Sequence, residues 1–241
     1  MNARFWGVEG SEDQQPGGRF RQVVAAVSVA LAAGTGWASA ARATTWYAAN
    51  NGLDDNPCTK TAPCRSVTKT MAVAAEGDTI VVGPGLYGDL NRDGIVGNTA
   101  GEETSGNSFA MIDVTKGLSI ISSDGAWATV IDANGAATAA VHIEANGTVF
   151  GKANKGFTIR NKNAAEFTGL IVWTPGDPQA VPTDVTVQGN VAESNYHGFV
   201  LGGTRTLAKG NVAISNENGF FIHGTEAVIS GNLAQSNGGG F

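Results

Sequence analysis

The last third of the chain contains the stretch GNVAESNYHGFVL (Gly189–Leu201), which recurs as GNVAISNENGFFI (Gly210–Ile222) and as GNLAQSNGGGF (Gly231–Phe241). Each copy begins 21 residues after the previous one. A fixed period of about 20–50 residues is typical of solenoid proteins, in which each unit buries its apolar face only against its neighbours. The repeat therefore predicts a solenoid.

The apolar runs inside each copy are short, Phe199–Leu201 and Phe220–Ile222, and Gly, Asn and Ser separate them. Runs of this length suit strands and are too short for helices. Parallel strands of neighbouring turns lie about 4.8 Å apart, so equivalent side chains stack. We therefore predict an all-β fold, a right-handed parallel β-helix of about seven turns over residues 44–241, counted from the ~21-residue repeat.

Some side chains recur at the same position in every copy, and we interpret them as structural ladders. Buried Asn side chains can hydrogen-bond along the solenoid axis, and stacked Phe rings can pack on one another. The predicted ladders are Asn190/Asn211/Asn232, Asn195/Asn216/Asn237 and Phe199/Phe220/Phe241. Because Phe241 falls within a ladder, we expect the domain to be incomplete at its C-terminus. The same alignment predicts an exposed ion pair between Arg205 and Glu226.

Composition indicates a compact, turn-rich protein, with 34 Gly, 42% hydrophobic and 15% charged residues. The net charge is −6, and the sequence contains no long basic run, which argues against nucleic acid as a partner. An acidic protein is also a weak argument against a polyanionic substrate unless calcium intervenes. Net charge nevertheless says little about the charge of an individual groove.

An export signal precedes the predicted domain. Arg19 and Arg21 are followed by the apolar run Val23–Ala33 and then by small residues up to Ala43. This order is typical of a secretory signal peptide, and the run is too short to span a bilayer. The alternative is an Ala-rich N-terminal helix of the domain. We expect residues 1–43 to be removed, leaving a monomer with no membrane span that is secreted, periplasmic or at the cell surface.

The only two cysteines, Cys58 and Cys64, lie in the short segment NPCTKTAPC. In an oxidising compartment such a pair favours a disulfide. A pair of free thiols is the alternative, and a structural zinc site is less consistent because it requires four ligands. We interpret the pair as a structural crosslink.

The region before the regular repeats is predicted to contain one helix and several strands. Ser66–Ala75 spaces apolar residues at helical intervals, and a helix there would cap the open end of the solenoid. The predicted strands are Thr45–Ala48, Thr79–Val82, Leu118–Ser122, Thr129–Ile131, Val141–Ile143, Gly156–Arg160, Leu170–Trp173 and Asp184–Val187. Two insertions, Gly88–Asn107 and Thr174–Pro182, are predicted to loop out, and ligand sites are often built on such loops.

The stretch WYAANNGLDDNPCTKTAPCRSVTKTMAVAAEGDTIVVGPGLYGD (Trp46–Asp89) resembles the N-terminal segment of secreted bacterial right-handed parallel β-helix proteins. The later GN-x-A-x-SN-x-x-GF units resemble repeats of the pectate-lyase-like superfamily. The resemblance implies a function among those of its members: polysaccharide lyases, glycoside hydrolases, mannuronan epimerases, copper-site maturation proteins and adhesin-like surface proteins. The fold alone does not decide among these activities.

One insertion contains a motif typical of calcium loops, Asp89-Leu90-Asn91-Arg92-Asp93-Gly94-Ile95-Val96. Asp89, Asn91 and Asp93 offer oxygen ligands at alternate positions, Gly94 permits a sharp turn, and Ile95 offers its carbonyl. Position 12 of the motif is Ala rather than an acidic residue, so Glu102 or Glu103 would have to replace it. The alternative is a polar loop that binds no metal.

Two functions are open at this point. The first is a carbohydrate-interacting protein, such as a polysaccharide lyase or hydrolase, with the ligand along a sheet face and Trp173 or Tyr196 stacking on sugar rings. The second is a non-catalytic surface or adhesin-like scaffold stabilised by calcium. His197 and His223 break the repeat and could act as acid or base, although a histidine near a turn is usually only solvated. The sequence shows no catalytic constellation typical of the family's enzymes.

Overall fold

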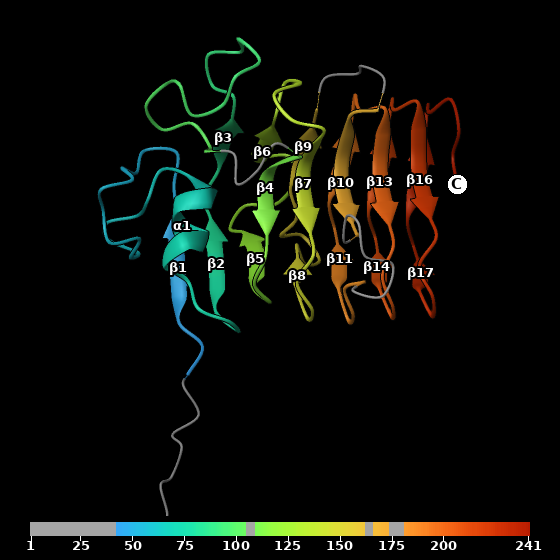
Figure 1. Cartoon of the computed structure of the whole chain (residues 1–241), viewed down its shortest axis with the longest axis horizontal. Coiled ribbons are helices and arrows are strands. Elements are labelled where there is room, and N and C mark those ends of the chain that lie inside the picture. Colours follow the sequence, from blue (N-terminus) through green and yellow to red (C-terminus); the bar gives the residue numbers. More distant parts are fainter. Residues whose placement is uncertain (1–41, 105–108, 162–165, 174–180) are drawn as a thin grey trace, which may run out of the picture. The chain divides into compact units, whose positions relative to one another are not determined.

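A computed structural model describes residues 42–104, 109–161, 166–173 and 181–241, in which three parallel sheets run along one axis (Figure 1). The predicted signal segment lies outside the described residues, apart from Arg42 and Ala43. The strands and the single helix of the described residues follow the chain in a regular order. A complete turn of the solenoid contributes one strand to each sheet, as β11, β12 and β13 do. The fold is the predicted right-handed parallel β-helix.

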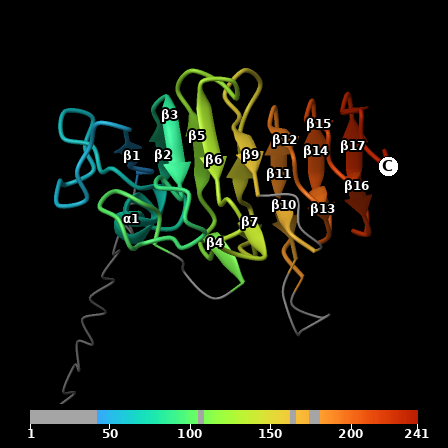
Figure 2. The same ribbon diagram turned by 90° about the horizontal axis from the view of Figure 1, so that it is seen from above.

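Within the described residues the three sheets contain seven, six and five strands, and Figure 2 shows from above how the strands of successive turns follow one another along the axis. The seven-stranded sheet comprises β1 (Thr45–Ala48), β2 (Thr79–Val82), β5 (Ser119–Ser122), β8 (Val149–Phe150), β11 (Thr186–Gln188), β14 (Leu207–Lys209) and β17 (Val228–Ser230). The six-stranded sheet comprises β3 (Gly85–Gly88), β6 (Thr129–Asp132), β9 (Thr158–Arg160), β12 (Val191–Glu193), β15 (Val212–Ile214) and β18 (Leu233–Gln235). The five-stranded sheet comprises β4 (Ala110–Val114), β7 (Ala139–Ile143), β10 (Thr168–Val172), β13 (His197–Leu201) and β16 (Asn218–Ile222).

The corners between the sheets explain why certain residues recur in each repeat. One residue at each corner adopts a left-handed backbone conformation, which lets the chain turn sharply into the next sheet. Gly189 has φ 69° and its equivalents Gly210 and Gly231 both have φ 62°, so glycine is favoured there. The equivalent serines Ser194, Ser215 and Ser236 form the next corner, with φ between 55° and 60°.

Both predicted Asn ladders are present inside these corners. In the ladder beside the serine corner, Asn195 donates its backbone N–H (3.0 Å) and its side-chain amide (2.9 Å) to Asn216 Oδ1. Asn216 repeats both contacts with Asn237, at 2.9 Å and 3.0 Å. This column therefore joins successive turns without covalent links.

The ladder beside the glycine corner ends in a residue that is less buried than expected. Asn211 donates its backbone N–H (2.8 Å) and its side-chain amide (3.0 Å) to Asn232 Oδ1, and the Asn232 amide donates to the Ala208 carbonyl (2.9 Å). Asn190 and Asn211 are fully buried, as expected of ladder residues, but Asn232 is only half-buried. The reason is that, among the described residues, no further turn packs over the turn of Asn232. Its hydrogen bonds confirm its place in the ladder, and its burial departs from the expectation.

The Phe ladder is also confirmed. The ring of Phe220 stacks on Phe199 and on Phe241, with centroids 5.0 Å and 4.8 Å apart. Phe199 is fully buried, whereas Phe241 is 71% exposed, because it is covered on one face only by the described residues. The last turn thus shows the same loss of burial in the Phe column as in the Asn column.

The predicted N-terminal helix is α1 (Val67–Val73), and it closes the first turn of the core. Ser66 caps it by accepting a hydrogen bond from the Lys69 backbone N–H. Val67 and Met71 are buried in the same cluster as residues of the first strands. At the other end of the helix, Lys116 Nζ donates to the carbonyls of Met71 (2.9 Å) and Ala74 (2.7 Å).

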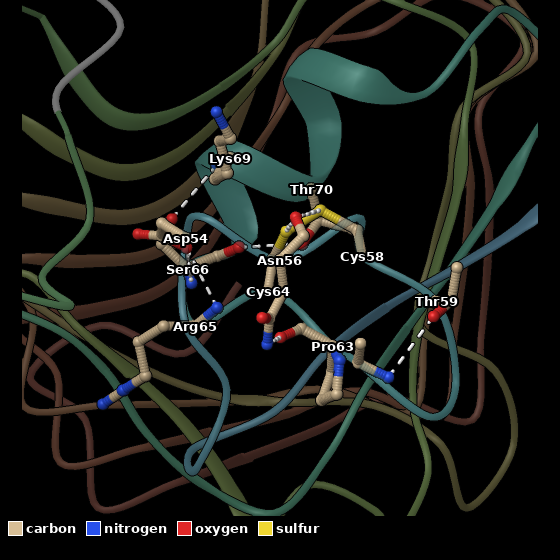
Figure 3. The surroundings of a disulfide bond; sticks show 11 residues. Asp54, Asn56, Cys58, Thr59, Pro63, Cys64, Arg65, Ser66, Lys69 and Thr70 are labelled. Atoms are coloured by element: carbon tan, nitrogen blue, oxygen red, sulfur yellow. Dashed lines mark hydrogen bonds between the residues drawn. A yellow bond between two sulfur atoms is a disulfide. The ribbon is translucent and has the colours of Figure 1, made fainter.

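A disulfide joins Cys58 and Cys64, as predicted, in the loop between β1 and α1 (Figure 3). Both cysteines are fully buried. The loop is held to the helix start by Asp54, whose carboxylate accepts the backbone N–H groups of Arg65 (2.9 Å) and Ser66 (2.8 Å). The pair is thus a structural crosslink beside the helix cap.

The prediction of an Arg205–Glu226 ion pair was wrong. Asp184, Arg205 and Glu226 are equivalent residues of successive turns, and all three have positive φ. Arg205 turns toward the preceding residue of this column and binds Asp184 with two hydrogen bonds of 2.7 Å and 2.6 Å. The sequence places two acids at equal spacing from the arginine, and only the side-chain conformation selects one.

Candidate functional site

The outer face of the five-stranded sheet carries a polar pair in a row of residues that is otherwise apolar. Residues in register on successive strands form a row that begins with Asp113 on β4 and His142 on β7 and continues through Ile171, Val200 and Phe221. The flanking positions on the strands point into the core, as Val141 and Ile143 do. Parallel pairing therefore brings a carboxylate and an imidazole together on adjacent strands.

His142 is held at both ring nitrogens. Nδ1 lies 2.7 Å from Asp113 Oδ1, and Nε2 lies 2.6 Å from the backbone carbonyl of Trp173. The ring of Phe109 packs against the imidazole edge-on, with centroids 5.2 Å apart. The imidazole thus has a fixed orientation, and its residue is 1% exposed.

The surroundings favour positive charge at this position. Burial lowers the pKa of His142, but the hydrogen bonds to Asp113 and to the Trp173 carbonyl and the charges of Asp113 and Glu144 outweigh it, so the net pKa is raised. Both ring nitrogens face oxygen acceptors, which a doubly protonated ring satisfies. A bound cation at Nδ1 is the other arrangement that the geometry accommodates.

Glu144, two residues beyond His142, completes a group of three possible metal ligands. Single ligand atoms of Asp113, His142 and Glu144 all lie within 4.8 Å of one another, and the two acids are partly exposed. One nitrogen and two oxygen donors suit a divalent transition metal such as copper(II). The Trp173 carbonyl strengthens the fit, because a ligating histidine usually donates its other ring N–H to a carbonyl or carboxylate.

An apolar groove of about 580 Å³ begins beside this group and crosses the same sheet toward the later turns. Its walls include Phe109, Trp173, Phe221, His197 and His223. Trp173 is 36% and Phe221 54% exposed, which is high for large apolar side chains. The groove offers aromatic surface for a ligand close to the polar group.

The family of the chain follows from its sequence. The family profile described as "Periplasmic copper-binding protein (NosD)" matches residues 71–241, which includes the whole polar group and groove. The chain belongs to the NosD family. A search of curated protein sequences found no significant match.

Two solved structures are similar to this NosD-family chain. A crystal structure of pectate lyase Pel9A is 17% identical, with a TM-score of 0.50 over 80% of this chain and 47% of its own. A rhamnogalacturonan lyase is 13% identical, with a TM-score of 0.38 over 80% of this chain and 62% of its own. The chain spans less than two thirds of either structure. At this identity, the likeness to the pectate lyase shows the fold alone.

The structure places the predicted calcium loop above β3, away from the polar group. The carboxylate of Asp89 accepts the backbone N–H groups of Arg92 and Gly94, both at 2.7 Å. Asp93 accepts the side-chain amides of Asn91 (3.0 Å) and Asn98 (2.6 Å). N–H donors thus satisfy both carboxylates in this structure.

Glu102 and Glu103 are the two candidates for the twelfth ligand of that loop, and their carboxylates contact different parts of the chain. Glu102 points into the loop, where it accepts four backbone N–H groups, from Leu90 (3.2 Å), Asn91 (3.3 Å), Asn98 (3.2 Å) and Thr99 (3.0 Å). Glu103 instead binds the start of α1 through the N–H groups of Val67 and Thr68, both at 2.8 Å. Of the two, Glu102 is the one whose carboxylate contacts the backbone of the loop.

The other residues singled out in the sequence lie along the groove or outside the described residues. Tyr196 packs its ring against His197, with centroids 4.7 Å apart, and His197 and His223 both line the groove on different turns. Trp173 lines it as well. Most of the insertion 174–182, expected at the rim, lies outside the described residues.

Sequence reasoning missed the polar group. β4, which carries Asp113, was assigned to no element, because the insertion before it has no repeat. Asp113 and His142 are 29 residues apart, as are His142 and Ile171, so the spacing of this row differs from the 21 residues of the later turns. A search for a second period would have aligned these positions.

Proposed function

We propose that this NosD-family protein is an exported copper-binding β-helix protein whose metal site consists of Asp113, His142 and Glu144. The observation that carries the proposal is the fixed orientation of His142, with Nε2 on the Trp173 carbonyl and Nδ1 toward Asp113. The family description, a periplasmic copper-binding protein, supports the choice of metal. In the described residues, no helix is long and apolar enough to cross a membrane.

The chemistry of the donors is suited to copper(II), which accepts imidazole nitrogen and carboxylate oxygen. His142 would supply nitrogen, while Asp113 and Glu144 would supply oxygen and offset the charge of the ion. Bound copper supplies a Lewis-acidic and redox-active centre. The buried imidazole and the Phe109 ring limit access of water from the groove side, and Asp113 also borders a second cavity of about 230 Å³ beneath α1.

Copper titration of the purified domain tests the proposal. The wild type should bind one copper(II) ion with nitrogen hyperfine coupling in its EPR spectrum. His142→Gln should lose the nitrogen coupling, and Glu144→Gln should weaken binding about 10–100-fold if the carboxylate is a ligand or orients one. Because His142 is buried, the partly exposed Glu144 provides the variant that is most certain to fold.

His223→Gln is the matched control, since it removes a groove histidine that lies outside the group. It should leave copper affinity and the EPR spectrum unchanged. Equal copper binding by the wild type and both site variants, or loss of binding only in the His223 variant, would contradict the assignment. Circular dichroism of each variant separates loss of a ligand from loss of the fold.

A second candidate function is carbohydrate binding in the groove beside this group, favoured by the exposed rings of Trp173 and Phe221. Aromatic rings present a flat apolar surface to which sugar rings can pack. Screening a polysaccharide panel with and without a chelator tests it, with Trp173→Ala as the variant. Product formation would indicate an enzyme, and binding without product would indicate a carbohydrate-binding protein. If neither is observed, the result favours the calcium-stabilised scaffold.

Export is part of the proposal. The buried disulfide suits an oxidising compartment, and the family description names the periplasm. Intact mass of material recovered from the periplasm or medium should show a start near residue 44. Recovery of a chain that retains residues 1–43 would contradict cleavage of the signal.

A further inference from the structure

A second groove, of about 510 Å³, follows the corner between the seven- and six-stranded sheets. Four successive turns contribute to it, through residues 124–127, residues 153–154, Gln188 with Gly189 and Val191, and Lys209 with Gly210 and Val212. Neighbouring turns are about 4.8 Å apart, so the groove extends roughly 14 Å along the axis. It is separate in the sequence and in the fold from the groove on the five-stranded sheet.

One wall of this groove is Trp127, which is 72% exposed. Tryptophan is usually buried for most of its surface, and an indole this exposed beside a concave surface is typical of a binding site. Asn154, Gln188 and Lys209 also line the groove. The groove therefore combines a flat apolar ring with hydrogen-bonding and cationic groups.

Three of the lining residues are corner glycines. Gly125, Gly189 and Gly210 all line the groove and have positive φ. At Gly210, an added Cβ would meet no atom within 4 Å, so the space above it is open, whereas at Gly189 it would meet the Lys152 carbonyl oxygen at 2.5 Å. The open space for a ligand therefore lies at Gly210.

Three lysines lie in or beside this groove, against one acidic residue in its lining. Lys209 lines the groove and is exposed. Lys152 and Lys155 are exposed on the turn that contains the lining residue Asn154, and Asp124 is the acidic residue in the lining. The chain as a whole has a net charge of −6. An anion is therefore favoured here by local electrostatics.

The backbone of the corner is already engaged, which excludes one class of partner. Gly189 donates its N–H to the Lys209 carbonyl (3.1 Å), and Gly210 donates to that of Ser230 (3.0 Å). A peptide strand that binds by extending a sheet needs unpaired backbone groups. Recognition here must use side chains: a ring for stacking, amides for hydroxyl groups and ammonium groups for carboxylates.

We propose that the groove of Trp127, Asn154, Gln188 and Lys209 binds an oligosaccharide that carries carboxylates, with a sugar ring on the Trp127 indole. The proposal is independent of the copper site and of the groove at Trp173. It requires no reaction. It also resolves the conflict between an acidic protein and an acidic glycan, because Lys209 in the groove and Lys152 and Lys155 beside it outnumber Asp124.

Binding is measured by calorimetry and by tryptophan fluorescence, in EDTA, with a uronic acid hexamer and a neutral glucose hexamer as probes. The wild type should bind the uronate more tightly, with an affinity that falls as salt is raised. Trp127→Ala should weaken binding at least about tenfold while leaving the melting temperature unchanged, because the side chain is exposed. Lys209→Gln should reduce the preference for uronate over glucose.

Gly210→Asn is the steric test, since Asn tolerates positive φ and its side chain would fill the open space above residue 210. It should weaken binding, and Trp173→Ala should not. The proposal is overturned if the uronate does not bind, if Trp127→Ala binds as well as the wild type, or if only Trp173→Ala loses binding. Equal affinity for both hexamers would overturn the assignment of an anionic ligand.

Discussion

Asn211 Oδ1 accepts two hydrogen bonds from one residue of the preceding turn, the backbone N–H (3.0 Å) and the side-chain amide (3.3 Å) of Asn190. Asn211 is fully buried, and its own amide donates to the Val187 carbonyl at 2.8 Å. A single side chain thus satisfies three buried polar groups of the preceding turn and joins that turn to its own.

Substitution of this ladder residue, Asn211→Ala, should lower the free energy of unfolding by about 2–4 kcal/mol, because it leaves buried donors and an acceptor without partners. Urea unfolding followed by circular dichroism measures the change. Gln235→Ala, at an exposed strand position, is the control and should shift stability by less than about 0.5 kcal/mol. Equal effects of the two substitutions would contradict a stabilising role of the ladder.

Asp78 should make the first turn of the solenoid sensitive to acid. Its carboxylate accepts hydrogen bonds from Trp46 Nε1 (2.7 Å), the Ala75 N–H (2.9 Å) and the Thr44 N–H (2.7 Å). These bonds, led by that of Trp46, and the charge of Lys116 lower the pKa of Asp78, although burial opposes them. The stabilisation is therefore present above the unfolded pKa of about 4 and is lost as pH falls through the lower folded pKa.

The variant Asp78→Ala tests this pH dependence. At pH 7 its melting temperature should be several degrees below that of the wild type, and the difference should narrow toward pH 2. Asp55→Ala, which removes an exposed carboxylate, is the control. A difference between Asp78→Ala and wild type that stays constant from pH 7 to pH 2 would show that the charge of Asp78 is not involved.

The loop of Asp89, Asn91, Asp93 and Ile95 stays a predicted calcium site. Calcium at about 100 times the dissociation constant should stabilise the protein by about 2.7 kcal/mol, which would be seen as a higher melting temperature. Asp93→Asn should reduce the shift, and Glu226→Gln, at an exposed corner, should not. A melting temperature that does not respond to calcium or EDTA would favour the metal-free loop, in which N–H donors satisfy both acids.

Removal of the Cys58–Cys64 crosslink should cost about 2 kcal/mol, from the loop-closure entropy of a short loop. The double variant with serine at both positions, and the wild type in reductant, should show the same loss in thermal melts. Thiol titration of secreted protein provides an independent measure. Two reactive thiols in the unfolded secreted protein would refute the bond.

The repeat made most of the fold predictable. β1 and β2 have the predicted bounds, and α1 lies within the predicted Ser66–Ala75. The other strands predicted in the earlier turns were found with bounds shifted by one or two residues, but β3, β4 and β8 were missed. β8 contains only Val149 and Phe150, and β4 follows an insertion, so neither has a periodic pattern that stands out from its surroundings.

The ladders and the disulfide could be predicted because they depend on spacing along the chain. Burial within a ladder could not be predicted in the same way, as Asn232 shows. Its spacing is identical to that of Asn190 and Asn211, yet it is only half-buried, whereas they are fully buried. Spacing specifies which residues stack, but burial also depends on whether another turn packs over them.

The candidate sites were much less predictable than the fold. The polar pair Asp113 and His142 and the Trp127 groove are built by residues from turns of unequal length. These residues lie side by side only because the turns stack, and they are far apart in the sequence. The exposure of Trp127 and the orientation of His142 depend on side-chain packing, which the pattern of residues does not specify.

The sequence by itself determined the solenoid, because a period of 21 residues with small residues at the corners leaves each strand only the equivalent strand of the next turn to pair with. It also determined the Asn and Phe columns. The tertiary structure alone decided which side chains meet on the outer faces: His142 between Asp113 and the Trp173 carbonyl, and Arg205 with Asp184 rather than Glu226. The physical reason is that backbone pairing sets the register, whereas contacts on the outer faces depend on loop lengths and side-chain conformations within that register.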